Sequence, residues 1–282
     1  MDRTVAFILS SNFSGSHYAS LMLGAHSKAA HVGEVCHFRK RQLRDKPACF
    51  RCGPRICPLF KDLTPATADR AFEILFDAVG PGTSLLVDTS KKLQWARRFL
   101  DHPGFGKRFV HLIRDPRALI RRWELTITDP REVRKRRWHV MRAYPPRFFH
   151  ALFAPRRKLW LYKWLAQNRR ITRFLRSRSL DHKVVTYCDL SRDPDGELRP
   201  LMDWIGLPYE PGQTEYWNVD HHGSQKVSYE WVKSEKRRFV DARWKEFLTP
   251  AEQKSFGANP DVLAYLAEIG VEISPEGLAR PK

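Results

Sequence analysis

The sequence lacks any hydrophobic run long enough to cross a membrane. None of its apolar stretches approaches the roughly 18 residues that a membrane-spanning helix needs, although 42% of the 282 residues are hydrophobic. Only four residues precede the first apolar segment at Val5, which leaves no room for a signal peptide. We therefore expect a cytoplasmic protein with a sizeable core, whose contact with a membrane would be peripheral.

The sequence also lacks the Gly-Lys-Ser/Thr ending of a nucleotide-hydrolase phosphate loop. An apolar strand is predicted at 5–9, small residues fill 10–16, and a packed helix follows. The loop amides and the positive end of the helix dipole would face one anion, and the hydroxyls of Ser14 and Ser16 add donors. Because no Lys follows Gly15, metal-assisted phosphoryl transfer is disfavoured. The segment predicts a phosphate-binding loop, and the alternative is an ordinary strand-to-helix turn.

Acidic residues are scarce, and the formal net charge is +19. Between Arg131 and Arg178, Glu132 is the only acid, and aromatic residues alternate with Lys and Arg. This basic aromatic segment, about 127–180, could bind nucleic acid, lie on anionic lipid, or steer polyanionic ligands towards a pocket. The alternative is a set of amphipathic helices with solvated arginines and buried aromatics, as the pattern at 159–175 indicates.

Cysteine is rare, with five residues, but four of them lie close together in an insertion at about 34–64. Cys49 and Cys52 are followed by Cys57, and Cys36 lies upstream. In a cytosolic chain such spacing is more typical of a metal site than of a disulfide. The hypothesis is a structural zinc ion held by these four thiolates. Redox-labile thiols and simple packing of a loop are the alternatives.

Strands and helices alternate along most of the chain. Strands are predicted at 5–9, 83–88, 107–113 and 182–187, and helices near 65–78, 93–100, 118–126 and 195–205. This order predicts one α/β domain over 1–282, with a mainly parallel sheet between two layers of helices. Polar clusters follow four strands, at 14–17, 88–91, 114–117 and 187–189. Because parallel strands end at one edge, we expect a single ligand site there.

The polar motifs resemble, in order and spacing, those of sulfotransferases that use 3′-phosphoadenosine 5′-phosphosulfate (PAPS), especially bacterial carbohydrate- and lipid-type members. The segments are FSGSHYASLML, LLVDTSKK, VHLIRDPRALIRRW, VVTYCDLSRDPDGELRPLMDWIGLPYE, and HHGSQKV with VDARWKEFLTPAEQ. The stretch CFRCGPRICP is similar to a Cys-rich insertion of bacterial members. The resemblance implies a P-loop-like fold and transfer of a sulfuryl group from PAPS to a hydroxyl or amine of a carbohydrate, lipid or small molecule.

The resemblance also implies roles for individual residues. Glu34 would be the base that takes the acceptor proton, with His17, His31 and His111 as alternatives, and Lys91 would neutralise the leaving phosphate. The residues expected to bind PAPS are Ser14, Gly15, Ser16, His17, Lys91, Arg114, Arg122, Gly223, Ser224 and Lys226.

The chain departs from the family pattern at two of these places. Phe13 stands where the family has a cation at the start of the loop, and Arg122 stands where it has a Ser. We therefore expect Lys91 and Arg114 to supply the missing positive charge. Two other functions compete with the sulfotransferase interpretation: a nucleotide kinase-like enzyme, and a non-catalytic protein that binds anionic membrane or, less favoured, nucleic acid.

Overall fold

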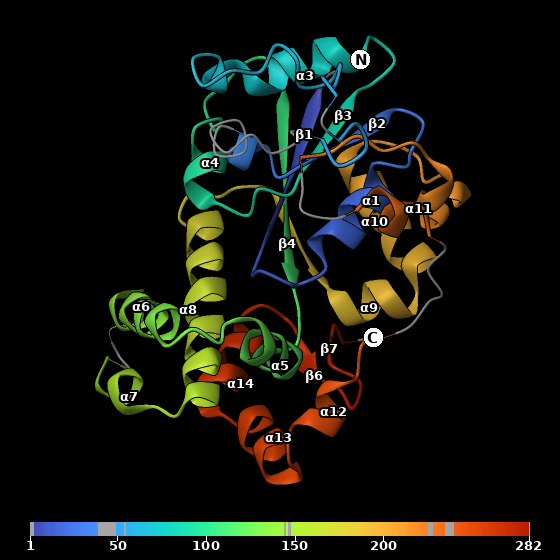
Figure 1. The fold of residues 1–282 in the computed structure, drawn as a ribbon. Coiled ribbons are helices and arrows are strands. Elements are labelled where there is room, and N and C mark those ends of the chain that lie inside the picture. The colour runs from blue at the N-terminus through green and yellow to red at the C-terminus, as the bar shows by residue number, and fades with distance from the viewer. Residues whose placement is uncertain are drawn as a thin grey trace.

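A five-stranded parallel sheet forms the centre of the computed structural model (Figure 1), which describes residues 3–38, 49–53, 55–143, 145, 148–224, 228–234 and 240–281. The strand order is β2-β3-β1-β4-β5. The strands are β1 (Thr4–Ser10), β2 (Ala29–Gly33), β3 (Leu85–Asp88), β4 (Gly106–Ile113) and β5 (His182–Thr186). Four of them confirm the strands predicted from the sequence. β2 was missed, because its five residues include two alanines and a glycine and carry little strand signal.

Helices cover both faces of the sheet, which confirms the predicted three-layer α/β fold. Successive residues of β1 point to opposite sides: Phe7 joins one buried cluster and Ile8 joins another. The first cluster packs under α3 (Ala71–Val79), α4 (Leu93–Arg97) and α8 (Arg156–Arg176). The second packs under α1 (Ser16–Leu23), α10 (Pro194–Ile205) and η4 (Pro211–Asn218). β1, buried on both sides, is therefore a rigid support for the loop that follows it.

A third buried cluster lies beyond the carboxyl ends of the strands, where the arrow of β4 ends near α5 in Figure 1. It is built around α5 (Pro116–Thr126), one end of α8, α6 (Pro130–Ala143), α7 (Phe148–Phe153), α12 (Trp244–Phe247), α13 (Pro250–Gly257) and α14 (Pro260–Glu268). The remaining elements are η1 (Val35–His37), η2 (Ala68–Arg70), α9 (Tyr187–Arg192), α11 (Tyr229–Lys233) and the hairpin β6–β7 (Glu272–Ile273, Leu278–Ala279).

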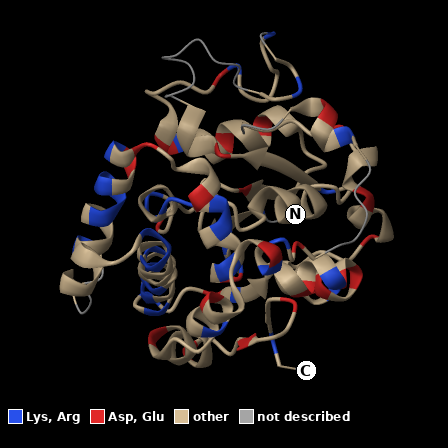
Figure 2. Ribbon diagram, turned by 60° about the horizontal axis from the view of Figure 1, so that its bottom comes forward, with Lys and Arg blue, Asp and Glu red and all other residues tan. Residues whose placement is uncertain are grey.

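The basic aromatic segment divides between core and surface. α8 buries Trp160 and Trp164 completely and confirms the amphipathic interpretation for that helix. On α6 and α7, by contrast, Trp138, Phe149 and Phe153 are 53%, 73% and 82% exposed. Figure 2 shows blue Lys and Arg along helices of this region, whereas both charges are spread over the rest of the molecule. Among the described residues, no helix has the length and apolarity to cross a bilayer.

Candidate active site

The loop between β1 and α1 has the conformation of an anion-binding turn. Phe13 and Gly15 both have positive φ, at 70° and 90°, and this turns the chain sharply into α1. A side chain at Gly15 would overlap the ring of Tyr187, so the close approach requires glycine as well as the backbone angle. The hydroxyl oxygen of Ser14 is buried and has no hydrogen-bond partner among the described residues. Together with the first amides of α1, this hydroxyl fits an anionic group.

Arg114, at the end of β4, lies directly beside this loop. Its guanidinium donates to the carbonyl of Phe13 at 2.9 Å and lies 4.1 Å from the centre of the Tyr187 ring. It also donates to Asp241 at 2.7 Å, while its Nε is buried without a partner in the described part of the chain. A buried guanidinium with a free donor next to an anion loop is suited to grip a phosphate.

Asp241 is held as a carboxylate by two arginines. Hydrogen bonds from Arg243 and then the charge of Arg114 keep the pKa of the Asp241 carboxyl well below its usual value, although burial acts in the opposite direction. The Asp241 carboxylate is therefore an internal anion that accepts a hydrogen bond from one nitrogen of the Arg114 guanidinium. Sequence reasoning missed this contact, since 127 residues separate the two partners.

Lys91 and Glu34 form the second charged pair of the site. The Lys91 ammonium donates to Glu34 Oε1 at 2.5 Å, and both side chains are largely buried. Lys91 follows β3 with a positive φ of 60°, and Glu34 follows β2, so neighbouring strand ends bring them together. The structure thus places two of the three residues expected to act in catalysis, Glu34 and Lys91, in direct contact.

Two imidazoles lie near the same carboxylate. His17 Nε2 is 3.8 Å from Glu34 Oε1, and His37 Nε2 is 3.9 Å from Glu34 Oε2. Burial raises the pKa of Glu34, but Lys91, His17 and His37 together outweigh burial and leave that pKa below its usual value. Glu34 is therefore a carboxylate at neutral pH. Because His17 is also the second residue of α1, it connects this pair to the anion loop.

Two of the three alternative bases, His31 and His111, lie in the sheet. His111 is buried in β4, where its Nε2 contacts Asn168 at 3.2 Å, and burial lowers its pKa to about 4. This is the environment of a neutral structural histidine. His31, in β2, is buried against Gly223 and Phe50 rather than beside the anion loop.

Arg122 reaches the loop from α5. Its guanidinium lies 4.9 Å from the centre of the Phe13 ring, and the ring itself is 42% exposed. A positive charge from α5 therefore lies beside Phe13, the position at which the resemblance led us to expect a cation in the loop. This cation–π pair gives a physical reason for the two sequence departures to occur together.

The segment carrying Gly223 and Ser224 runs beside the end of β2. Ser224 forms an isolated parallel β-bridge with Gly33, and its carbonyl oxygen accepts a hydrogen bond from the amide of Glu34 at 2.6 Å. Both residues therefore border the site from the outer edge of the sheet. Lys226, the other residue expected here, lies outside the described residues.

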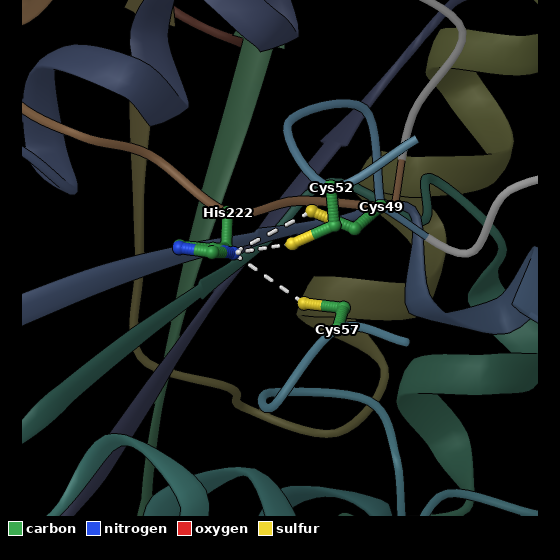
Figure 3. A group of neighbouring side chains, drawn as sticks. All are labelled: Cys49, Cys52, Cys57 and His222. Atoms are coloured by element: carbon green, nitrogen blue, oxygen red, sulfur yellow. Dashed lines mark hydrogen bonds between the residues drawn. The ribbon is translucent and has the colours of Figure 1, made fainter. Parts of the chain in front are cut away.

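The Cys-rich insertion meets this same segment. The sulfur atoms of Cys49, Cys52 and Cys57 lie 3.6, 3.5 and 3.4 Å from Nδ1 of His222 (Figure 3). Cys36 is not part of the group: its thiol donates to the carbonyl of Ser90, and burial raises its pKa to about 12. The expectation of Cys36 as fourth ligand is therefore wrong, and His222 takes that place.

His222 carried only a weak sequence signal. It is one of two adjacent histidines in a motif that the sequence assigned to the nucleotide, and 165 residues separate it from Cys57. Cys36 was chosen because it is near in sequence. It turns away because η1, which contains it, packs its backbone against Ser90, where the Cys36 amide donates at 3.0 Å.

An anion loop after the central strand of a parallel sheet defines a class of α/β protein that holds a phosphorylated ligand at its strand ends. Two solved structures share this architecture over nearly the whole chain. The sulfotransferase domain from the curacin biosynthetic pathway has a TM-score of 0.59 at 17% identity, with 95% of this chain and 97% of that one covered. The sulfotransferase domain from the Synechococcus PCC 7002 olefin synthase has a TM-score of 0.54 at 17% identity, with 97% and 96% covered.

The likeness identifies the fold as the one seen in sulfotransferase domains, which confirms the resemblance read from the motifs at the level of fold. No family model matches the sequence, and no curated protein matches it.

Proposed function

We propose that this protein is a sulfotransferase that uses PAPS as donor and a hydroxyl or amine of a carbohydrate, lipid or small molecule as acceptor. One observation carries the proposal. In a fold shared with sulfotransferase domains, the anion loop, the Arg114 guanidinium and the Lys91–Glu34 pair meet at the carboxyl edge of the sheet.

The reaction would place two demands on these residues. The acceptor oxygen or nitrogen forms a bond to sulfur while the bond from sulfur to the bridging phosphate oxygen breaks, and the acceptor loses a proton. Adenosine 3′,5′-bisphosphate leaves with the bonding electrons. The site must therefore neutralise charge on the departing phosphate and provide an acceptor for one proton.

The phosphate-binding residues suit the donor at two points. The buried Ser14 hydroxyl and the amides of Gly15, Ser16 and His17 would hold the 5′ phosphosulfate. The free Nε of Arg114 would donate to the 3′-phosphate, in competition with Asp241. A doubly charged phosphate is a stronger partner for a guanidinium than a single carboxylate shared with Arg243.

Glu34 and Lys91 divide the chemical work. Glu34 is ionised at neutral pH and would accept the proton of the acceptor, while Lys91 would turn towards the leaving phosphate as negative charge develops there. Separation of the pair would also free the carboxylate and raise its basicity. His17, 3.8 Å from Glu34, is the second group that can receive a proton.

The donor proposal is tested by thermal unfolding with adenosine 3′,5′-bisphosphate, AMP and ATP. We expect only the bisphosphate to raise the melting temperature strongly, because a ligand at 100 times its Kd stabilises by about 2.7 kcal/mol. Arg114→Ala should remove the preference over AMP. Arg108→Ala is the matched control, since Arg108 is on the same strand but pairs with Asp181. Equal shifts with all three nucleotides would contradict the proposal.

Turnover with labelled PAPS tests the base. Glu34→Gln should retain the bisphosphate shift and lose most of its turnover, because the amide cannot take a proton. Full turnover of this variant would assign the proton to another group, with His17 as the next candidate.

A further inference from the structure

Three thiols and one imidazole converge on one point in the Cys-rich insertion. The sulfur atoms of Cys49, Cys52 and Cys57 and Nδ1 of His222 all lie within 4.8 Å of one another. The four side chains come from two segments, and Figure 3 shows the imidazole facing the three sulfurs. Cys49 and Cys57 are buried at 0% and 3% exposure, and Cys52 at 9%.

Hydrogen bonds alone do not explain this arrangement. A histidine Nδ1 has one proton to donate or one lone pair to accept with, but here it has three sulfur neighbours at 3.4–3.6 Å. Zinc bonds of about 2.3 Å to sulfur and about 2.0 Å to nitrogen, at tetrahedral angles, separate the two ligand atoms by about 3.5 Å. The observed separations match this value on all three sides.

We propose that Cys49, Cys52, Cys57 and His222 bind a zinc ion. Three thiolates and an imidazole favour zinc over magnesium or calcium, which require oxygen ligands. Four protein ligands complete the tetrahedron and leave no position for substrate, so the ion is structural.

The ion would fasten two segments that border the candidate active site. The amide of Phe50, next to Cys49, donates to the carbonyl of Gly223 at 3.1 Å, and Ser224 continues alongside Gly33 and Glu34. The Arg51–Asp220 ion pair also joins these two segments, but its side chains are 31% and 48% exposed, and exposed pairs contribute little. The metal would thus join the Cys-rich insertion to the segment 220–224, which itself pairs with the end of β2 through backbone hydrogen bonds of Ser224 with Val32 and Glu34.

The site predicts a functional consequence that rests on the proposed sulfotransferase activity. Without the metal, the segment 220–224 would keep its backbone hydrogen bonds to β2 but lose its anchor in the Cys-rich insertion, and this edge of the nucleotide site would loosen. Metal loss should therefore lower affinity for adenosine 3′,5′-bisphosphate as well as the melting temperature.

Metal content of the purified protein tests the site without reference to any activity. We expect about one zinc ion per chain after growth with zinc, and replacement by Co²⁺ should give the thiolate charge-transfer and d–d bands of a tetrahedral sulfur-rich site. His222→Ala should lose its zinc to a chelator concentration that leaves the original protein loaded. Cys36→Ser is the matched control and should keep its metal, because its sulfur is outside the group.

A second variant separates metal loss from misfolding. Unlike His222→Ala, the His222→Cys variant should bind zinc, because a fourth cysteine replaces the imidazole as ligand. Its circular dichroism should match that of the original protein. A chain that binds no zinc or cobalt and has freely titrating thiols would overturn the proposal. So would a disulfide among these cysteines under reducing conditions, or metal that is lost in Cys36→Ser and kept in His222→Ala.

The two proposals fail in different ways. Zinc bound at these ligands in a chain that shows no preference for the bisphosphate would retain the metal site and reject the proposed activity. A chain that binds no metal but is selectively stabilised by adenosine 3′,5′-bisphosphate would reject the metal site and retain the proposed activity.

Discussion

At the scale of single residues, the contact between Glu34 and Lys91 decides how the candidate base behaves. Burial raises the pKa of the carboxyl, and the ammonium with the two imidazoles lowers it further than burial raises it. The state needed to accept a proton is therefore fully present above the ordinary carboxyl range near 4.3 and is lost only as pH falls below it. A carboxylate with so low a pKa is a weak base. Movement of the Lys91 ammonium away from Glu34 and towards the leaving phosphate would therefore make Glu34 more basic.

The Lys91→Met variant tests this coupling. With the ammonium removed, burial dominates and the pKa of Glu34 rises, so the acidic limb of the kcat/KM profile should move to higher pH. The maximal rate should also fall, because the leaving phosphate loses a cation. An unchanged acidic limb in residual turnover would show that Glu34 is not the group whose protonation limits the rate.

Lys163 is a second residue-scale case, because it is a lysine inside the core. Its Nζ lies 3.1 Å from the centre of the Trp123 ring, has no hydrogen-bond partner in the described chain, and is 6% exposed as a residue. Burial, with the charge of Arg136, holds the pKa of Lys163 well below its usual value.

We expect Lys163→Met to raise the free energy of unfolding by about 1–3 kcal/mol at neutral pH. The unfolded chain binds a proton that the folded chain gives up, so the original protein gains stability as pH rises towards about 10.4, the unfolded value. The difference in the free energy of unfolding between Lys163→Met and the original protein should therefore shrink as pH rises towards that value. Denaturant titrations at several pH values measure it, and an advantage that grows with pH would contradict this account.

At the scale of elements, the turn from β1 into α1 is the feature on which nucleotide binding depends. Gly15 and Gly206 have nearly the same backbone, with φ and ψ of 90° and 15° against 97° and 24°. A methyl group at Gly206 would meet nothing within 4 Å, whereas one at Gly15 would overlap Tyr187. Alanine would suffer the strain of a positive φ at both positions but would overlap a neighbour only at Gly15. Comparing the two substitutions therefore distinguishes backbone strain from steric overlap.

Gly206→Ala should cost about 1–2 kcal/mol of stability and leave bisphosphate binding unchanged. Gly15→Ala should cost more and abolish the bisphosphate shift, because the loop must move away from Tyr187. Thermal unfolding with and without the nucleotide measures both effects. Equal losses of stability with intact binding in both variants would show that the loop tolerates displacement.

At the scale of the whole molecule, we propose that the basic helix α6 and the exposed aromatics of α7 contact anionic membranes. Trp138 is exposed on α6, a helix rich in Arg and Lys whose residues line a shallow hollow of about 530 Å³. Phe149 and Phe153 are exposed on α7, which packs against α6. Helices that lie at a membrane surface typically combine apolar side chains, which enter the headgroup region, with Lys and Arg, which attract anionic lipids. Such a surface would suit a lipid-linked acceptor.

We expect the protein to float with phosphatidylserine vesicles at low salt and to detach as ionic strength rises. Trp138→Ser combined with Phe153→Ser should reduce binding at least several-fold. Leu263→Ser is the matched control, since Leu263 is 46% exposed on α14, a helix whose charged residues are acidic. Binding to neutral vesicles at the same level would argue against the electrostatic part of this interpretation.

The sequence by itself determined four of the five strands of the sheet and the edge at which the predicted site residues gather. Strand and helix periodicity are local, and parallel strands end at one edge, so the clusters after β1, β3 and β4 had to lie together. Only the tertiary structure decided the partners: His222 for the cysteines, Asp241 for Arg114, and Lys91 for Glu34. These pairs are separated by 165, 127 and 57 residues, and no periodicity or spacing encodes contacts made only when distant segments pack. For the same reason Cys36, the nearest cysteine in sequence, was the wrong fourth ligand.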